Sequence, residues 1–263
     1  MGKSFLLTID LEEFDRASGQ RQFTISKEGL DALIPLLDRI GVPATFFTTA
    51  SFASQFPETI RELSEKHEIA LHALEHQDNY KTMERKEAGK RLSKAKYTLE
   101  DIIGNEYQIV GFRAPQMQAP EMSTLADIGL KYDSSLHPTY VPGRYSHHRE
   151  TMEIHRTENV VRVPVSVTPI LRQAYSWIWF RVGGVWLAKW NTRMTERKMD
   201  FITNYFHPWD FRDLRNVEGI STIYAWNTHR SIGMLERYLE WFKGRQYRFL
   251  TMGDYLKETG WLE

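Results

Sequence analysis

Two short acidic and histidine-rich segments have the residue types of a catalytic metal site. In the first, residues 10–13 (DLEE), Asp10 and Glu12 point the same way if the chain stays extended. In the second, residues 72–76 (HALEH), His72 and His76 are four positions apart, a spacing that on a helical turn places both rings on one face. Two histidines and one carboxylate form hydrolytic metal sites that keep positions open for water and substrate. The pattern predicts a divalent metal, with Zn²⁺ as first choice and Co²⁺, Ni²⁺ or Fe²⁺ as alternatives.

Each segment also has a simpler interpretation. In a chain with nine histidines, a His-x-x-x-His pair is more often a surface helical pair, and an acidic cluster is usually a solvated turn or helix cap. The metal interpretation is favoured because both segments directly follow predicted strands. Further candidate ligands have no well-spaced partner and are expected to be exposed loop residues: Glu13, His67, Glu75, His147 and His148.

Alternating strands and helices are expected to position these segments. Short β-rich runs occur at residues 5–9, 44–48, 69–71, 109–112, 203–206 and 247–250. Between and after them, helical patterns occupy residues 30–40 (stopped by Gly41), 57–63, 84–102, 231–242 and 254–258. This alternation predicts a parallel sheet or barrel, in which functional side chains gather at the C-terminal ends of the strands.

Residues 136–191 break the alternation and are interpreted as an elaboration of the barrel, with one predicted strand at 160–165. Their aromatic stretch, residues 174–190, carries Arg181 and Lys189 and is too short to span a bilayer. It is interpreted as a sugar-stacking loop, a patch that contacts a membrane, or a helix buried over the barrel.

Composition narrows the class of protein. The 263 residues fit one α/β domain covering 1–263, and no linker or repeat marks a boundary. Lys plus Arg and Asp plus Glu each total 34, which argues against nucleic-acid binding. There are no cysteines, so any metal must bind histidine and carboxylate. The start of the sequence lacks a secretory signal pattern, which predicts a cytoplasmic protein, in solution or at the inner face of the membrane. The oligomeric state is not indicated.

The order of the segments resembles that of the polysaccharide deacetylase family, also called the NodB homology domain or carbohydrate esterase family 4, over most of the chain. Residues 8–13 (TIDLEE) resemble the family's first motif, and residues 67–72 (HEIALH) resemble its HEIASH sequence. Three later motifs resemble GFRAP at 111–115, YDSS at 132–135 and YFHPWD at 205–210. The last is similar to the HPWE of the exopolysaccharide-type members.

The resemblance implies roles for single residues. It implies Asp10 as general base, His207 as general acid, and Glu12, His72 and His76 as metal ligands. It implies that Arg113 pairs with the base and that the backbone amide of Gln116 faces the oxyanion, although this chain has Gln116-Met117 where the family often has Tyr-Gly. Asp133 is expected either in the catalytic motif or as a turn residue. Trp209 and Trp179 are expected to contact the substrate.

The resemblance also implies a fold and an activity. The implied fold is a distorted, incomplete (β/α) barrel with a loop-rich elaboration before the last strands. The implied activity is metal-dependent removal of an N-acetyl group from an amino sugar. The expected cytoplasmic location further predicts that the substrate is a nucleotide- or lipid-linked precursor, or a glycan, in the biosynthesis of a surface polysaccharide. Two alternatives stay open: a deformylase or other linear amidase of the same fold, and a non-catalytic sugar-binding module.

Overall fold

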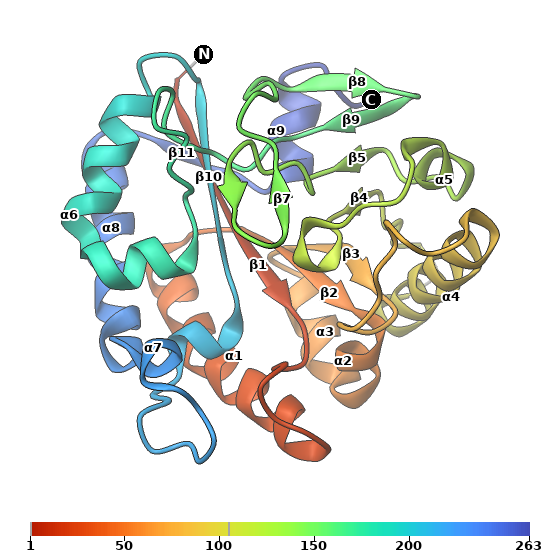
Figure 1. Cartoon of the computed structure of the whole chain (residues 1–263), viewed down its shortest axis with the longest axis horizontal. Coiled ribbons are helices and arrows are strands. Elements are labelled where there is room, and N and C mark those ends of the chain that lie inside the picture. The colour runs from red at the N-terminus through yellow and green to blue at the C-terminus, as the bar shows by residue number, and fades with distance from the viewer. Residues whose placement is uncertain (1, 105) are drawn as a thin grey trace.

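The core of the protein is one curled, mostly parallel sheet. The computed structural model describes residues 2–104 and 106–263. In this part of the chain the main sheet has nine strands in the order β10-β1-β2-β3-β4-β5-β9-β8, and β11 also pairs with β1 (Figure 1). All of its pairs are parallel except β8 with β9. The strands are β1 (Ser4–Leu11), β2 (Ala44–Thr49), β3 (Glu68–Ala73), β4 (Gly111–Phe112), β5 (Tyr132–Asp133), β8 (His155–Thr157), β9 (Val160–Arg162), β10 (Phe201–Phe206) and β11 (Arg248–Phe249).

Helices surround this open half-barrel on its outside (Figure 1). They are α1 (Gln20–Ile40), α2 (Ala50–Gln55), α3 (Pro57–Ser64), α4 (Arg85–Ile103), α5 (Met122–Asp127), α6 (Trp177–Thr195), α7 (Thr222–Ala225), α8 (Ser231–Gly244) and α9 (Met252–Glu258). A small hairpin of β6 (Tyr140–Val141) and β7 (Tyr145–Ser146) stands apart from the main sheet. The predicted fold class, an incomplete (β/α) barrel, is confirmed.

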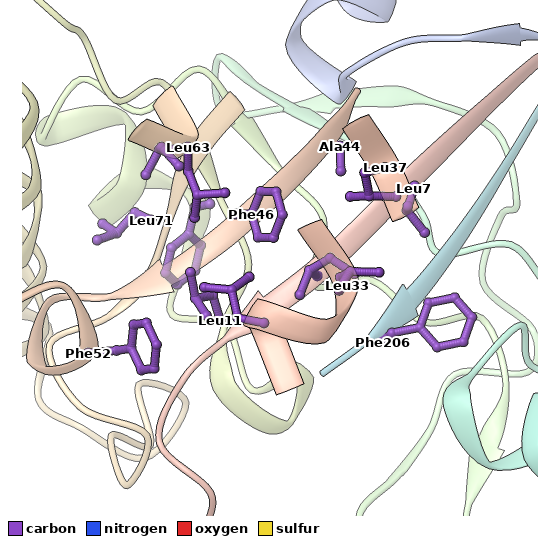
Figure 2. Packing of buried hydrophobic residues seen from close by; sticks show 14 of the residues in the cluster. Leu7, Leu11, Leu33, Leu37, Ala44, Phe46, Phe52, Leu63, Leu71 and Phe206 are labelled. Carbon is purple, nitrogen blue, oxygen red and sulfur yellow. The ribbon is translucent and has the colours of Figure 1, made fainter. Parts of the chain in front are cut away.

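The hydrophobic core holds the N-terminal strands against α1. Every residue of β1 and β2 is buried, as expected of parallel strands covered on both faces. Figure 2 shows Leu33 and Leu37 of α1 in one cluster with side chains of these strands, including Leu7 and Phe46. The helix ends at Gly41, whose φ of 72° is the left-handed conformation that glycine adopts without strain. The core thus fixes the end of β1, where the acidic segment begins.

Most predicted elements are found, with different lengths. Helix α1 begins ten residues before the predicted start at residue 30, because residues 20–29 are mostly polar and give no apolar periodicity. The predicted strand at 109–112 is only two residues long in β4. Gly111 there accommodates the Tyr132 ring, since a Cβ at this glycine would lie 2.1 Å from Cζ of Tyr132. The short elements α2, α5 and β5 were not predicted.

The predicted elaboration at 136–191 contains β6 to β9 and most of α6. Helix α6 packs on α8 and is kinked at Gly184, where φ is 64° and ψ is −169°. No helix in residues 2–104 and 106–263 combines the length and the apolar character that crossing a membrane requires.

Candidate active site

A cavity of about 390 Å³ opens at the C-terminal ends of β1, β3 and β10. Residues of the β6–β7 hairpin and of the start of α6 form its other walls. A hollow of similar volume between α1 and α3 is lined largely by charged side chains, among them the ion pairs Lys27–Asp31 and Lys66–Asp38. The predicted site residues that line the first cavity are Asp10, Glu12, His72, His76, Gln116, Trp179, His207 and Trp209.

Glu12 lies at the centre of the predicted metal site. Its Oε2 is 3.0 Å from Nε2 of His72 and 2.5 Å from Nδ1 of His76. Its Oε1 is 3.7 Å from Nε2 of His207. Three histidines from two distant parts of the chain, the end of β3 with its following loop and the end of β10, therefore converge on one buried carboxylate.

The two predicted histidine ligands do not lie on a helical turn, so that part of the prediction is wrong. His72 lies on β3, and His76 lies in the loop after it. The chain turns there because Oδ2 of Asp78 accepts the backbone N–H groups of Leu74 and Glu75, at 3.2 and 3.4 Å. The turn brings the His76 ring back toward the end of β3.

Glu13 and His67 were expected to be exposed, and both expectations are wrong. Glu13 is only 4% exposed and accepts hydrogen bonds from Thr49 and Ser51. It also accepts the backbone N–H of His76 at 2.8 Å, so it ties the end of β1 to the loop that carries the second histidine. His67 is 8% exposed, and its Nδ1 accepts the N–H of Ala44, which joins β2 to the start of β3. Glu75 and His148 are exposed as expected, and His147 is half-buried.

The charges of the cluster are mutually stabilised. Burial alone would raise the pKa of the Glu12 carboxyl, but His76 and His72 hold it well below its ordinary value. Burial alone would lower the pKa of His76, but Glu12 raises it to about 9. The carboxylate and the His76 ring thus form a tight ion pair in the protein as described.

The cluster matches a divalent ion by the types of its donor atoms, but not by their spacing. Zinc prefers histidine nitrogen and carboxylate oxygen, and its ligands in a tetrahedral site lie about 3.3 Å apart. Within the described residues, no three His, Asp or Glu side chains are already spaced to enclose an ion. The Glu12 oxygen is closer than that distance to both ring nitrogens and bonds them directly. By donor type, the residues that would hold an ion are Glu12, His72 and His76.

Asp10 is paired with Arg113, as the sequence motif implies. Nη1 of Arg113 donates to Oδ1 of Asp10 at 2.7 Å and to Oγ1 of Thr8 at 2.8 Å. The guanidinium is fully buried, bonds Ser134 through two further donors, and stacks over the Phe47 ring. This is a rigid support for one carboxylate oxygen and not the surface ion pair that an isolated arginine would usually make.

His207 is oriented by Asp210, a residue to which the sequence analysis gave no role. Oδ2 of Asp210 accepts the backbone N–H of His207 at 2.8 Å and lies 3.4 Å from its Nδ1. The Trp209 ring stacks on the imidazole at 4.5 Å. Burial alone would lower the pKa of His207, but Asp210, Glu12 and Asp10 raise it. Nη2 of Arg181 lies 3.6 Å from the other Asp210 oxygen, Oδ1, and both side chains are buried.

Gln116 lines the cavity, whereas Asp133 lies outside its lining. Asp133 is buried outside the cavity lining, where it bonds Arg162 and accepts from the backbone and hydroxyl of Ser135. Since Ser135 Oγ in turn accepts the N–H of Ala114, Asp133 supports the segment that follows Arg113. Gln116 is exposed at the cavity with a left-handed φ of 53°.

His137 is a cavity residue that the sequence analysis missed. Its Nδ1 bonds the hydroxyl of Tyr145 at 2.9 Å, while its buried Nε2 has no hydrogen-bond partner in the described protein. Burial, with a smaller contribution from Arg113, lowers its pKa to about 3, so the ring is neutral. A single histidine two residues after the YDSS motif gives no spacing signal, so only the three-dimensional placement reveals it.

Comparisons with known proteins agree with this geometry at the level of family and fold. Residues 3–132 match a family described as "Polysaccharide deacetylase", and residues 134–257 match a "Domain of unknown function (DUF3473)". No curated protein sequence matches the chain.

Several solved structures share the fold. A Mycobacterium smegmatis protein assigned to the polysaccharide deacetylases is 20% identical, with a TM-score of 0.60 over 96% of this chain and 94% of that one. Puue allantoinase is 13% identical, with a TM-score of 0.64 over 95% and 88%. A Bacillus anthracis pseudoenzyme of the CE4 family is 13% identical, with a TM-score of 0.55 over 96% and 65%. At these identities the likeness concerns the fold alone.

Proposed function

Because the chain belongs, over residues 3–132, to the polysaccharide deacetylase family, we propose that it is a metal-dependent hydrolase that removes an N-acetyl group from an amino sugar. The observation that carries the proposal is the convergence of two units on one cavity. Glu12, His72 and His76 form one unit, and the supported pair of Asp10 with Arg113 forms the other. A ligand set beside an anchored carboxylate is what hydrolysis of an amide by water requires.

The attack of water is assigned to Asp10 and the cluster beside it. A divalent ion held by Glu12, His72 and His76 would supply a Lewis acid for the amide oxygen and lower the pKa of a nearby water to about 7. Arg113 holds Oδ1 of Asp10, which leaves Oδ2 to take a proton from the attacking water. Gln116 lies at the cavity beside this segment, and its backbone N–H is proposed to face the developing oxyanion.

The departure of the sugar amine is assigned to His207. An amine leaves poorly unless its nitrogen is protonated, so a proton donor is needed on the far side of the scissile bond. Asp210 fixes the His207 ring through its Nδ1 side, so that Nε2 faces the cluster and can give its proton to the amine. Trp209 restricts the ring further by stacking on it, and would contact the sugar from the same wall.

The substrate is proposed to be a nucleotide- or lipid-linked precursor, or a glycan, of a surface polysaccharide. The HPWD segment at 207–210 and the aromatic wall with Trp179 support this choice. We also propose that residues 1–263 act as one catalytic domain, since Asp10 and His207 come from distant parts of the chain and line the same cavity.

The test is acyl release from N-acetyl amino sugars, together with metal analysis. We expect acetate release by the wild type, loss of turnover but retained metal in Asp10→Asn, and loss of both in His72→Ala. The exposed positions Asp31→Asn and His148→Ala serve as matched controls that keep both properties. Full activity of Asp10→Asn, measured as acetate per minute, would refute the base assignment.

Two rival functions are separated by the same assay. The fold is shared by an allantoinase and by a pseudoenzyme, so fold alone does not choose among them. A deformylase or other linear amidase would release formate or another acid in place of acetate. A non-catalytic sugar-binding module would bind the sugar and release nothing, although this chain keeps a candidate base, ligand set and acid together.

A further inference from the structure

Helix α6 presents an unusual outer surface beside the cavity. Its inner side packs on α8, where Phe180 contacts the Tyr238 ring and Thr192 bonds the Tyr238 hydroxyl. Its outer side carries four exposed apolar side chains: Trp179, Val182, Trp186 and Trp190 are 44, 59, 75 and 38% exposed. Isolated exposed apolar residues are ordinary, but three tryptophans on one helix mark an interaction surface.

These side chains form two short stripes, one on each side of the kink at Gly184. Before the kink, Trp179 and Val182 are three residues apart. After it, Trp186, Trp190 and Arg193 are spaced by four and three residues and therefore share one helix face. We call Trp179, Val182, Trp186, Trp190 and Arg193 the outer face of α6. The neighbouring helix α7 adds exposed Ile223, and Trp226 directly after it is also exposed. Helix α7 is joined to α6 where Arg181 donates to the carbonyl of Tyr224.

The stretch of sequence that contains α6 carries only basic charges. The chain as a whole has equal numbers of acidic and basic residues, yet no Asp or Glu occurs between Glu158 and Glu196. Lys189 and Arg193 lie on α6 within this stretch, and the exposed residues Arg197 and Lys198 follow the helix. Tryptophan combined with lysine and arginine is the composition that favours the headgroup region of an anionic bilayer.

The outer face is continuous with the mouth of the cavity. Trp179 belongs to both, because it is exposed on α6 and also lines the cavity. Tyr140 from the β6–β7 hairpin is likewise exposed and lines the same mouth. A molecule held in a bilayer under α6 would therefore have its headgroup next to the entrance.

We propose that the outer face of α6 docks the protein on an anionic lipid surface, so that a lipid-linked amino sugar enters the cavity from the membrane. That the headgroup is an amino sugar rests on the proposed deacetylase function, whereas docking on the membrane does not depend on it. A second copy of the chain fits this surface less well, because an isologous interface would bring the same basic residues against one another.

Docking is tested by sedimentation with vesicles of equal parts phosphatidylglycerol and phosphatidylcholine, compared with phosphatidylcholine alone. We expect the wild type to sediment with the anionic vesicles and to be released by high salt. The double variant Trp186→Ser/Trp190→Ser should lower the bound-to-free ratio about tenfold or more, and Arg193→Gln should lower it by a smaller factor. Tyr97→Ser and Lys90→Gln, exposed changes on α4, are the matched controls and should bind as the wild type does.

Two outcomes would overturn the proposal. One is equal vesicle binding by the wild type and the double tryptophan variant. The other is absence of binding combined with a dimer, seen by analytical ultracentrifugation, that the double variant dissociates. Acetate release from a soluble N-acetyl sugar is measured in parallel and should be the same in both proteins. Failure of that activity in the wild type would count against the proposed function and leave the vesicle result standing.

Discussion

The floor and the mouth of the cavity are built in opposite ways. The floor, formed by Asp10, Glu12, His72 and His207 with Arg113 bonded beneath Asp10, comes from the ends of strands or the residues directly after them. Its side chains are buried or nearly so, and each bonds or lies beside another charged or polar group of the floor. The mouth, formed by His137, Tyr140, Tyr145, Trp177 and Trp179, comes from loops, the β6–β7 hairpin and α6, and is mostly aromatic.

This difference separates two tasks. Strands held by a close-packed core keep side chains within the narrow tolerance that bond cleavage needs. Loops and a kinked helix tolerate changes of sequence and shape, which suits recognition of a particular substrate. Mutations of the floor should therefore affect stability and turnover, and mutations of the mouth should affect binding.

The largest effect is expected from Arg113→Met. The change leaves the buried Asp10 carboxylate without its cation, and removal of one partner of a buried ion pair costs about 3–5 kcal/mol. Urea unfolding at pH 7 measures the loss in the free energy of unfolding. Arg85→Met removes an exposed ion pair with Asp127 and should cost at most about 1 kcal/mol. Similar losses in the two variants would mean that the floor is not held by charge pairing.

The floor was largely predictable from the sequence, and the reason is local. Asp10, Arg113 and His207 each follow a short apolar run, and side chains after parallel strands meet at one edge of the sheet. The error about His72 and His76 arose because the i, i+4 spacing suits a helix, whereas here a strand and a turn bring the rings together. Glu13 was misjudged because its partners Thr49, Ser51 and the His76 amide are distant in sequence.

The mouth was hardly predictable. His137 and Tyr145 follow no periodic pattern, and their bond depends on how the loop at 136–146 folds back. The exposure of α6 likewise depends on which of its sides meets α8. A mostly apolar composition does not reveal this, so the buried and the exposed interpretations could not be separated.

The second largest effect is expected from Asp210→Asn. An asparagine keeps the size of the side chain but removes the charge that holds the Nδ1 side of His207, and losing such a supporting group lowers activity about 10- to 100-fold. The loss should appear in kcat with little change in KM or metal content, because the residue orients the proton donor and does not touch the substrate. Asp213→Asn, an exposed neighbour paired with Arg215, should leave kcat unchanged. A change confined to KM would contradict the orienting role.

The third prediction concerns pH and tests the burial of His137 at the mouth. The pKa of His137 is about 3 in the folded protein against an ordinary value of 6.5, so between these values the unfolded chain binds the extra proton. Stability is then lost as the pH falls from 6.5 toward 3, by at most about 1.4 kcal/mol per pH unit. His137→Gln keeps a side-chain partner for Tyr145 and removes this titration.

Urea unfolding at pH 7 and pH 5 checks the expectation for His137. The free energy of unfolding should fall less in His137→Gln than in the wild type, with a difference of up to about 2 kcal/mol at pH 5. His148→Gln, at an exposed position, should behave as the wild type does. Identical pH dependence in all three proteins would show that His137 takes up its proton in the folded state.

The smallest effect is expected from Trp179→Ser, and it decides whether mouth and floor act separately. Trp179 lines the cavity and makes no hydrogen bond to a floor residue. Its loss should therefore weaken binding of the substrate and of the transition state equally. We expect KM for an N-acetyl amino sugar to rise about three- to tenfold, in line with the roughly 0.5–1.5 kcal/mol of an aromatic contact, with kcat unchanged. Trp186→Ser, on the same helix but outside the cavity lining, should leave KM for a soluble substrate as it is. If Trp179→Ser lowered kcat instead, the aromatic wall would be part of the chemistry, and the division between a catalytic floor and a recognising mouth would not hold.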